Sequence, residues 1–205
     1  MICSALADGI CTLTIDRPER ANALTRAMLE DLESAVGRAE AEETRVLVIT
    51  GAGRLFSAGA DLGEAQAGLA TDPIWERLSG RIAALPCLTI AALPGTAAGG
   101  ALGMVLACDL RIAARETDIF YPVMRLGFLP QPSDPARLTA LVGPARAKML
   151  LMGGARIDAQ EALAWGLVDR VIARSGLTEA VDAVSADARA ASGSHVAALK
   201  RFWTG

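Results

Sequence analysis

The sequence contains a single histidine, His195, and no cysteine pair with the spacing of a metal or redox site. A histidine-based zinc site or a Ser-His-Asp triad would have to use His195, which lies near the C-terminus and far from every glycine-rich turn. We therefore interpret it as a surface or packing residue and predict no metal site. Cys3, Cys11, Cys87 and Cys108 lie in apolar runs, which is typical of buried free thiols in a reducing cytosol.

Lysine is also scarce, and the basic residues are mostly arginine. The formal net charge is −3, and lysine occurs only at Lys148 and Lys200, so the sequence has no nucleic-acid-binding footprint. Its first eight residues lack the basic segment and long apolar core of a signal peptide, which predicts a cytoplasmic protein. With 205 residues, 52% of them hydrophobic, the chain suits one ordered domain.

One uncharged stretch, Ile82 to Cys108, is long enough to cross a bilayer and holds two G-x-x-x-G pairs. Pro86 and Pro94 would break a helix there twice, and the residues between them have the pattern of a strand. We therefore predict no membrane span. Within this stretch, Gly99 and Gly100 follow the apolar strand and precede a helical segment.

The first turn of a helix leaves backbone N–H groups without partners in the helix. Small residues there let another group approach these N–H groups closely. This pattern favours an anion-binding or oxyanion site made of backbone around Gly99 and Gly100. The alternative is a buried helix whose glycines only permit close packing. A nucleotide-binding reading of Thr50–Phe56 is weaker, because Phe56 replaces the third glycine of G-x-G-x-x-G.

Strands alternate with helices along the chain, which predicts an α/β architecture with a mostly parallel sheet. A hairpin is expected first, and Thr25, Asp61 and Asp158 each have the position of a helix N-cap. The expected strands are 2–6, 10–15, 46–49, 88–92, 109–113, 118–121 and 167–172, and the expected helices start near 26, 61, 73, 100, 136, 144, 159, 177 and 194.

Two segments together resemble the signature regions of the crotonase superfamily, the enoyl-CoA hydratase/isomerase proteins. They are Val48–Leu62 and Pro94–Asp109. Arg17–Leu24 is similar to the family's acyl-CoA-binding loop, and Ala162–Val171 to the segment after its core. The likeness implies a ClpP/crotonase-type spiral of β-β-α units as a single domain over residues 1–205, with a core at about 10–172 and a helical tail at 177–203.

The resemblance further implies that two backbone N–H groups polarise the carbonyl of an acyl-CoA thioester. By motif position these belong to Ala60 and Gly100. The residues that the resemblance assigns to acyl-CoA binding are Arg20, Ala21, Ala23, Ala58, Ala60, Asp61, Leu62, Gly100, Gly103, Pro122, Val123 and Gln131. Coenzyme A enters as part of the substrate, so no tightly bound cofactor is expected.

The sequence departs from the hydratase pattern at the groups that move protons. Hydratases of this family use two glutamates to position and activate water, and here Gly103 and Val123 stand at those positions. Neither side chain transfers a proton. Some relatives carry an acid where Gln131 stands. Asp134, three residues further on, is the remaining acidic candidate, although the prolines around it equally suit a turn or cap residue.

Two nearby residues, Asp118 and Tyr121, are additional candidates, and Tyr121 is interpreted as packing. Family members usually carry more C-terminal helix, which helps to build trimers or hexamers, so Phe202 and Trp203 are expected to pack on a neighbour or on the core. The sequence leaves two functions open. One is an enoyl-CoA hydratase/isomerase-like enzyme acting through an enolate, with ordinary hydration doubtful, and the other is a non-catalytic acyl-CoA-binding protein.

Overall fold

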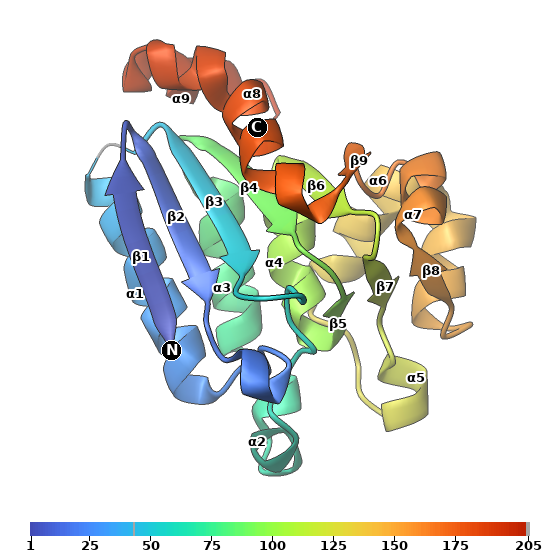
Figure 1. Cartoon of the computed structure of the whole chain (residues 1–205). Coiled ribbons are helices and arrows are strands. Elements are labelled where there is room, and N and C mark those ends of the chain that lie inside the picture. The colour runs from blue at the N-terminus through green and yellow to red at the C-terminus, as the bar shows by residue number, and fades with distance from the viewer. Residues whose placement is uncertain (43, 204–205) are drawn as a thin grey trace.

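The structure is a computed structural model and describes residues 1–42 and 44–203. A six-stranded sheet in the order β1-β2-β3-β4-β6-β9 forms its centre (Figure 1). β1 and β2 form an antiparallel hairpin, and every further pairing in this sheet is parallel. Its strands are β1 (Ile2–Ala7), β2 (Ile10–Ile15), β3 (Val46–Gly51), β4 (Leu88–Leu93), β6 (Leu110–Ala114) and β9 (Arg170–Ile172).

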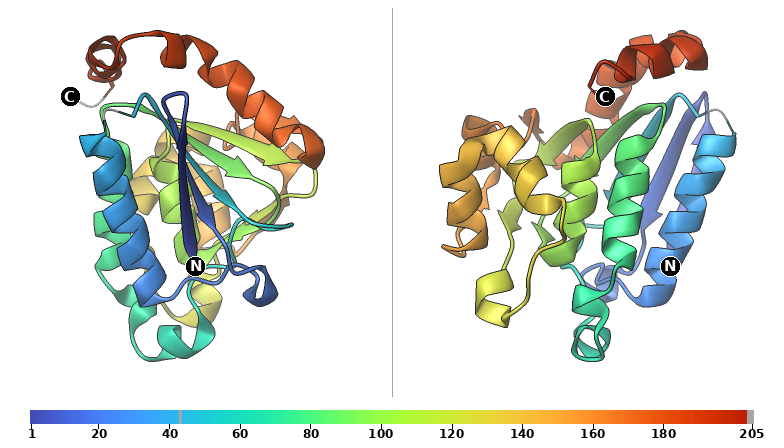
Figure 2. Two further views of the ribbon diagram at one scale, coloured as in Figure 1. Left: turned by 60° about the vertical axis from the view of Figure 1, so that its left-hand side comes forward. Right: turned by 180° about the vertical axis from the view of Figure 1, so that it is seen from behind.

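Helices cover both faces of this sheet (Figure 2). Side chains alternate along β3, so Leu47 and Ile49 join the large core under the helices of one face, whereas Val46 and Val48 join a smaller core under α8. This double burial explains why β3 is a continuous apolar run. The helices are α1 (Arg26–Ala41), α2 (Leu62–Gln66), α3 (Ile74–Ala84), α4 (Leu102–Ala107), α5 (Val123–Leu126), α6 (Asp134–Leu151), α7 (Ala159–Trp165), α8 (Leu177–Ala190) and α9 (Gly193–Lys200).

The expected helix caps are confirmed. Thr25 Oγ1 accepts a hydrogen bond from Met28 N at 3.3 Å, and Asp158 accepts one from Glu161 N at 2.8 Å. Asp61 does the same for Gly63 N at 3.1 Å. Short side chains with an oxygen satisfy N–H groups that the first helical turn leaves without a carbonyl partner, so these starts are readable from the sequence.

A second sheet and several boundaries differ from the expectation. β5 (Ala97–Ala98), β7 (Asp118–Phe120) and β8 (Arg156–Asp158) form a three-stranded sheet, in which β5 and β8 have no sequence signal of their own. The two helices expected at 136–141 and 144–152 are confirmed as the two parts of α6, which are separated at Gly143 by a non-helical φ of 79°. The strand expected at 167–172 begins only at Arg170, and α5 was not foreseen.

The stretch from Ile82 to Cys108 folds into the end of α3, β4, β5 and α4, and none of the described helices is long and apolar enough to cross a membrane. Of the four cysteines, Cys3 is exposed, contrary to expectation, because β1 is the edge strand. The other three are buried, and burial raises the pKa of the Cys87 thiol to about 11.

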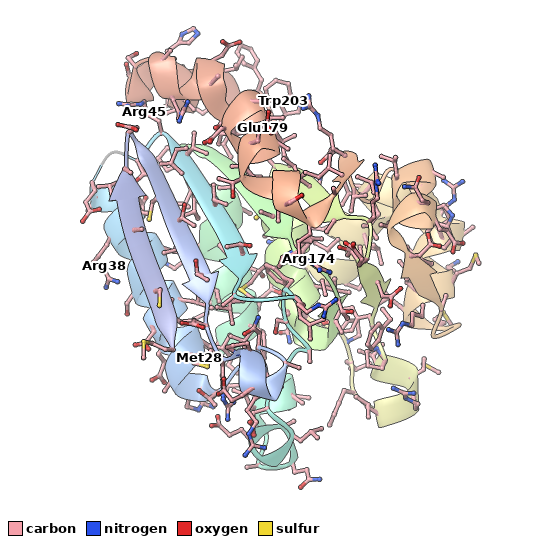
Figure 3. All side chains as sticks on the ribbon, in the orientation of Figure 1. Met28, Arg38, Arg45, Arg174, Glu179 and Trp203 are labelled. Carbon is pink, nitrogen blue, oxygen red and sulfur yellow. The ribbon has the colours of Figure 1, made fainter. Side chains whose placement is uncertain are left out.

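The C-terminal elements are tied back to the central sheet. Lys200 Nζ donates to the Cys87 carbonyl and to the Asp109 carboxylate, both at 2.8 Å. Arg174, labelled in Figure 3, donates to the Pro94 carbonyl at 2.6 Å. Phe202 and Trp203 are 82% and 77% exposed, so packing of these rings on the core is wrong. His195 is exposed on α9.

Candidate active site

The turn between β3 and α2 carries the first predicted N–H donor and is held by one buried asparagine. Asn22 Nδ2 donates to the carbonyl oxygens of Ala52 at 3.0 Å and Leu55 at 2.8 Å, while its Oδ1 accepts from Arg17 N at 2.9 Å. Asn22 is fully buried and has a φ of 54°, which asparagine tolerates better than most residues. It therefore joins the loop at 17–24 to the loop at 52–55.

Ser57 continues this connection toward the site. Its Oγ donates to the Asn22 carbonyl at 2.8 Å and accepts from Gly59 N at 3.1 Å. Ser57 also pairs with Ala97 as a parallel bridge, through which Ala98 N donates to the Ser57 carbonyl at 2.9 Å. The turn is thereby fastened to the segment that carries the second predicted donor.

Two glycines bring the donor segments together. A Cβ on Gly59 would stand 3.0 Å from the Ala98 carbonyl oxygen and 3.5 Å from Gly100 N. Gly59 and Gly99 have φ values of 95° and 58°, which side chains rarely adopt. The absence of side chains therefore lets the two backbones touch at this point.

The predicted donors keep their N–H groups available. Leu24 N donates to Gly59 O and Asp61 N donates to Leu24 O, so the bridge between Leu24 and Ala60 uses the groups on either side of Ala60. The N–H of Ala60 itself then points away from Leu24. Gly100 is the second residue of the 3-10 helix Gly99–Ala101, and N–H groups of a first helical turn have no acceptor within the helix.

Both donors border a cavity of about 130 Å³. We call the side formed by Ala58–Ala60 and Gly99–Gly100 the glycine wall, and the opposite side, Tyr121–Val123, the tyrosine wall. The remaining lining side chains are apolar: Leu62, Ala65, Ala70, Trp75, Leu126, Phe128 and Leu129. Trp75 packs beneath Gly100, where a Cβ would lie 3.2 Å from its ring, and its Nε1 donates to the Leu69 carbonyl at 2.8 Å.

The structure brings part of the predicted binding set to this cavity. Ala58, Ala60, Leu62, Gly100, Pro122 and Val123 line it. Arg20, Ala21 and Ala23 lie in the neighbouring loop, where the Ala21 carbonyl accepts from Ala58 N at 3.0 Å. The Asp61 carboxylate is paired with Arg17 at 2.9 Å, and this hydrogen bond together with that from Gly63 N lowers its pKa. Gln131 is buried, and its carbonyl accepts from Asp134 N at 3.0 Å.

Gly103 faces the carboxylate of Asp134. A Cβ on Gly103 would stand 3.2 Å from Asp134 Oδ1 and 3.5 Å from Oδ2, so the carboxylate fills space next to a missing side chain. Asp134 is fully buried and accepts a hydrogen bond from the Tyr121 hydroxyl at 2.9 Å, whereas Oδ1 has no partner among the described residues. The side chain is therefore directed at the tyrosine wall and does not cap α6.

The surroundings of Tyr121 and Asp134 raise the pKa of both side chains. Burial raises the pKa of Asp134 to about 6, and Glu76 adds to this, while the Tyr121 hydroxyl and Arg137 oppose it. Burial and the neighbouring carboxylate raise the pKa of Tyr121. Ser133 donates to Glu76 through both its N–H, at 3.2 Å, and its hydroxyl, which fixes the start of α6 on α3.

Sequence reasoning did not single out Asn22 or Trp75, and it interpreted Tyr121 as packing. Asn22 is the chain's only asparagine, and its place in a loop next to small residues was an available signal. Trp75 had none, because it lies on the buried face of an ordinary amphipathic helix. The partner of Tyr121 is 13 residues away along the chain and becomes visible only in the fold.

The molecule is an α/β protein with a wide, mostly parallel sheet beside a small second sheet, and its backbone donors border an apolar cavity. Comparison with known proteins identifies the family. The sequence model described as enoyl-CoA hydratase/isomerase matches residues 6–204. A probable enoyl-CoA hydratase of Mycobacterium leprae is 36% identical over 176 residues, which are 83% of this chain and 71% of that protein.

Two further relatives agree. The 1,2-epoxyphenylacetyl-CoA isomerase of Escherichia coli is 33% identical over 181 residues, covering 83% of this chain and 69% of that protein. The crystal structure of an enoyl-CoA hydratase from Bacillus anthracis superposes with a TM-score of 0.91 at 32% identity, covering 98% of this chain and 81% of that one. The chain belongs to the enoyl-CoA hydratase/isomerase family and has the crotonase fold, as the sequence predicted.

Proposed function

We propose that this protein binds an acyl-CoA thioester with the thioester oxygen between the N–H groups of Ala60 and Gly100, and that it acts on the acyl group through an enolate. One observation carries the proposal: two backbone donors, for which the described residues offer no acceptor, border an apolar cavity. An enolate concentrates negative charge on that oxygen. Fixed donors in a dry site stabilise such charge by about 3 kcal/mol each.

Isomerisation fits the cavity better than hydration. A bound water needs two or more polar partners. The only polar side-chain groups among the described lining residues are the Tyr121 hydroxyl and the Trp75 N–H, and both already donate to protein oxygens. The N–H groups of Ala60 and Gly100 are assigned to the thioester oxygen. Gly103 and Val123 stand where a hydratase would carry glutamates. Proton removal and return within one acyl group requires no water, so double-bond migration is the proposed reaction class.

A non-catalytic acyl-CoA-binding protein is the second candidate, and the same two residues favour it. Gly103 and Val123 leave the binding elements in place without the family's usual acid and base. In either case we expect Ala58, Asp61 and Leu62 to border the coenzyme, with exposed Arg20 meeting a phosphate group. Assembly into trimers or hexamers also remains a proposal, which sedimentation analysis of the purified protein tests directly.

Binding and turnover are tested together. Purified protein is titrated with crotonyl-CoA by calorimetry, and then assayed for loss of the enoyl thioester absorbance and, with a 3-enoyl-CoA, for double-bond migration. Binding followed by migration without hydration is the expected result. Binding without either change would favour the non-catalytic candidate. Failure of every acyl-CoA to bind contradicts both candidates.

The oxyanion assignment has its own test. A thioester labelled with carbon-13 at the carbonyl should show a lower carbonyl stretching frequency when bound, because the two N–H groups polarise the bond. A CoA thioether that lacks the carbonyl should bind at least tenfold more weakly. Gly100→Pro removes one donor and should diminish the frequency shift in a variant whose circular dichroism is unchanged. An undiminished shift would rule out Gly100 as a donor.

A further inference from the structure

The cavity contains one titratable side chain among its described lining residues, Tyr121. The other lining side chains are alanines, leucines, a valine, a proline, a phenylalanine and a tryptophan, and none of these exchanges protons near neutral pH. Any acid–base step by a side chain of this lining therefore has to pass through the Tyr121 hydroxyl.

That hydroxyl has one side-chain hydrogen-bond partner among the described residues. It donates to Asp134 Oδ2 at 2.9 Å, and the second carboxylate oxygen, Oδ1, is buried without a hydrogen bond. A buried carboxylate oxygen left without a donor is costly and uncommon in native proteins. If Asp134 served only to cap α6 or to pack, its oxygens would be expected to accept from the helix N–H groups that begin beside it.

The Asp134 carboxylate lies close enough to the expected thioester position to take part in proton transfer there. Gly103 follows Gly100 by three residues, so both lie on one face of the same helical segment, about 5 Å apart along its axis. Asp134 Oδ1 lies against Gly103, because that residue has no side chain. The Tyr121–Asp134 pair thus lies about one helical turn from the donor expected to hold the thioester oxygen.

We infer that Tyr121 and Asp134 form a proton relay that removes and returns a proton of the bound acyl group; this rests on the proposed function. The C–H bond at the α-carbon breaks, its proton passes to Tyr121 Oη, and the tyrosine's own proton passes to Asp134 Oδ2. The electron pair forms the enolate, whose oxygen lies between the N–H groups of Ala60 and Gly100. The reverse transfer, to the α-carbon or to the γ-carbon of a 3-enoyl group, restores the tyrosine and the carboxylate.

In this relay Tyr121 is the catalytic residue, and Asp134 is the proton acceptor that acts through it. A neutral tyrosine is a poor base alone, whereas concerted transfer to a carboxylate never forms a free phenolate. The charged and titratable groups around Asp134 are Tyr121 from the residues just after β7, Glu76 from α3 and Arg137 from α6 itself. Since burial holds the pKa of Asp134 near 6, the accepting carboxylate form dominates at pH 7 and diminishes below pH 6.

The test measures proton exchange apart from binding. Butyryl-CoA is incubated with the protein in D2O, and deuterium incorporation at the α-carbon is followed by mass spectrometry, with affinity measured by calorimetry. Tyr121→Phe and Asp134→Asn should each lower the exchange rate at least 100-fold, with Kd for butyryl-CoA within threefold of the wild type. Asp187→Asn on the exposed face of α8 is the matched control and should exchange at the wild-type rate.

The wild-type exchange rate should rise with pH through an apparent pKa of about 6 and level off above it. This profile does not depend on whether either variant folds, and a purely structural pair would not produce it. A folded Tyr121→Phe variant with wild-type exchange overturns the relay, as does a wild-type rate that is flat between pH 5 and 7. Tight binding with no exchange in the wild type overturns the relay and favours the non-catalytic acyl-CoA-binding candidate, whereas no binding of any acyl-CoA overturns both candidate functions.

Discussion

The two walls of the cavity are built on different principles. The glycine wall presents backbone N–H groups, and its shape depends on where side chains are absent: at Gly59, Gly99 and Gly100. The tyrosine wall presents one hydroxyl, and its chemistry depends on which side chain stands behind it. A backbone N–H donor is kept in most substitutions at its own position, whereas a single substitution removes a side-chain acid. A site of this kind can therefore keep its backbone donors while its side-chain acids and bases change.

Removing the hydrogen bonds that support the glycine wall should cause the largest loss of stability. Asn22→Ala removes three hydrogen bonds and leaves the partly buried Ala52 and Leu55 carbonyls without their donor, so the free energy of unfolding should fall by about 3 kcal/mol. Urea denaturation measures this loss. Gln160→Ala, which truncates an exposed amide, is the control and should cost less than about 0.5 kcal/mol. A similar small loss for both variants would show that Asn22 does not hold the wall.

At the tyrosine wall, the free energy of unfolding should depend on pH through Asp134. The pKa of Asp134 is higher in the folded chain, about 6, than its ordinary value of 3.8, so the native state binds more protons between these values. Its contribution to stability is complete below pH 4 and is lost as the pH rises through 6, by about 3 kcal/mol. Asp134→Asn should remove this part of the pH dependence, as measured by urea denaturation at pH 4 and pH 7.

Asp187→Asn serves as the reference for that comparison. Its stability should follow the wild-type curve, because the carboxylate is exposed on α8. Parallel curves for the wild type and Asp134→Asn would mean that Asp134 has an ordinary pKa in the folded protein.

The close approach within the glycine wall can be separated from backbone strain. Gly59→Ala adds a Cβ 3.0 Å from the Ala98 carbonyl at a φ of 95° and should cost about 2 kcal/mol, with at least tenfold weaker binding of acyl-CoA. Gly154→Ala has a φ of 65° but open space around it, so it should cost about 1 kcal/mol and leave binding unchanged. Thermal denaturation and calorimetry measure the two effects. Equal binding by both variants would contradict the role of the contact.

The smallest effect is expected at Ser57. Ser57→Ala loses the bond to the Asn22 carbonyl and the one from Gly59 N, which should lower stability by about 1 kcal/mol. Because Gly59 then loses its anchor, Kd for acyl-CoA should rise a few-fold. Ser194→Ala on exposed α9 is the matched control. An unchanged Kd for acyl-CoA in Ser57→Ala would show that Ser57 does not help to position the N–H donors and that Asn22 does so without it.

Local chemistry made much of the fold predictable. Thr25 and Asp158 mark helix starts because a short oxygen-bearing side chain satisfies nearby N–H groups, and Val46–Ile49 marks a strand buried on both faces because every residue is apolar. β5 and β8 were missed because a strand of two or three residues has too few positions for any periodicity to show. The break within α6 was predicted at the correct place, because Gly143 takes a non-helical φ of 79° and Pro144 follows it.

The sequence by itself determined the family and the strand–turn–helix units, and it predicted the two N–H donors, because each depends on small residues at fixed positions within one short segment. Only the tertiary structure decided that Gly59 touches Gly99, that Trp75 packs beneath Gly100, and that the Asp134 carboxylate reaches Tyr121 in the space beside Gly103. These contacts join segments that are far apart along the chain. Their chemistry follows from burial and distance, which the order of residues does not contain.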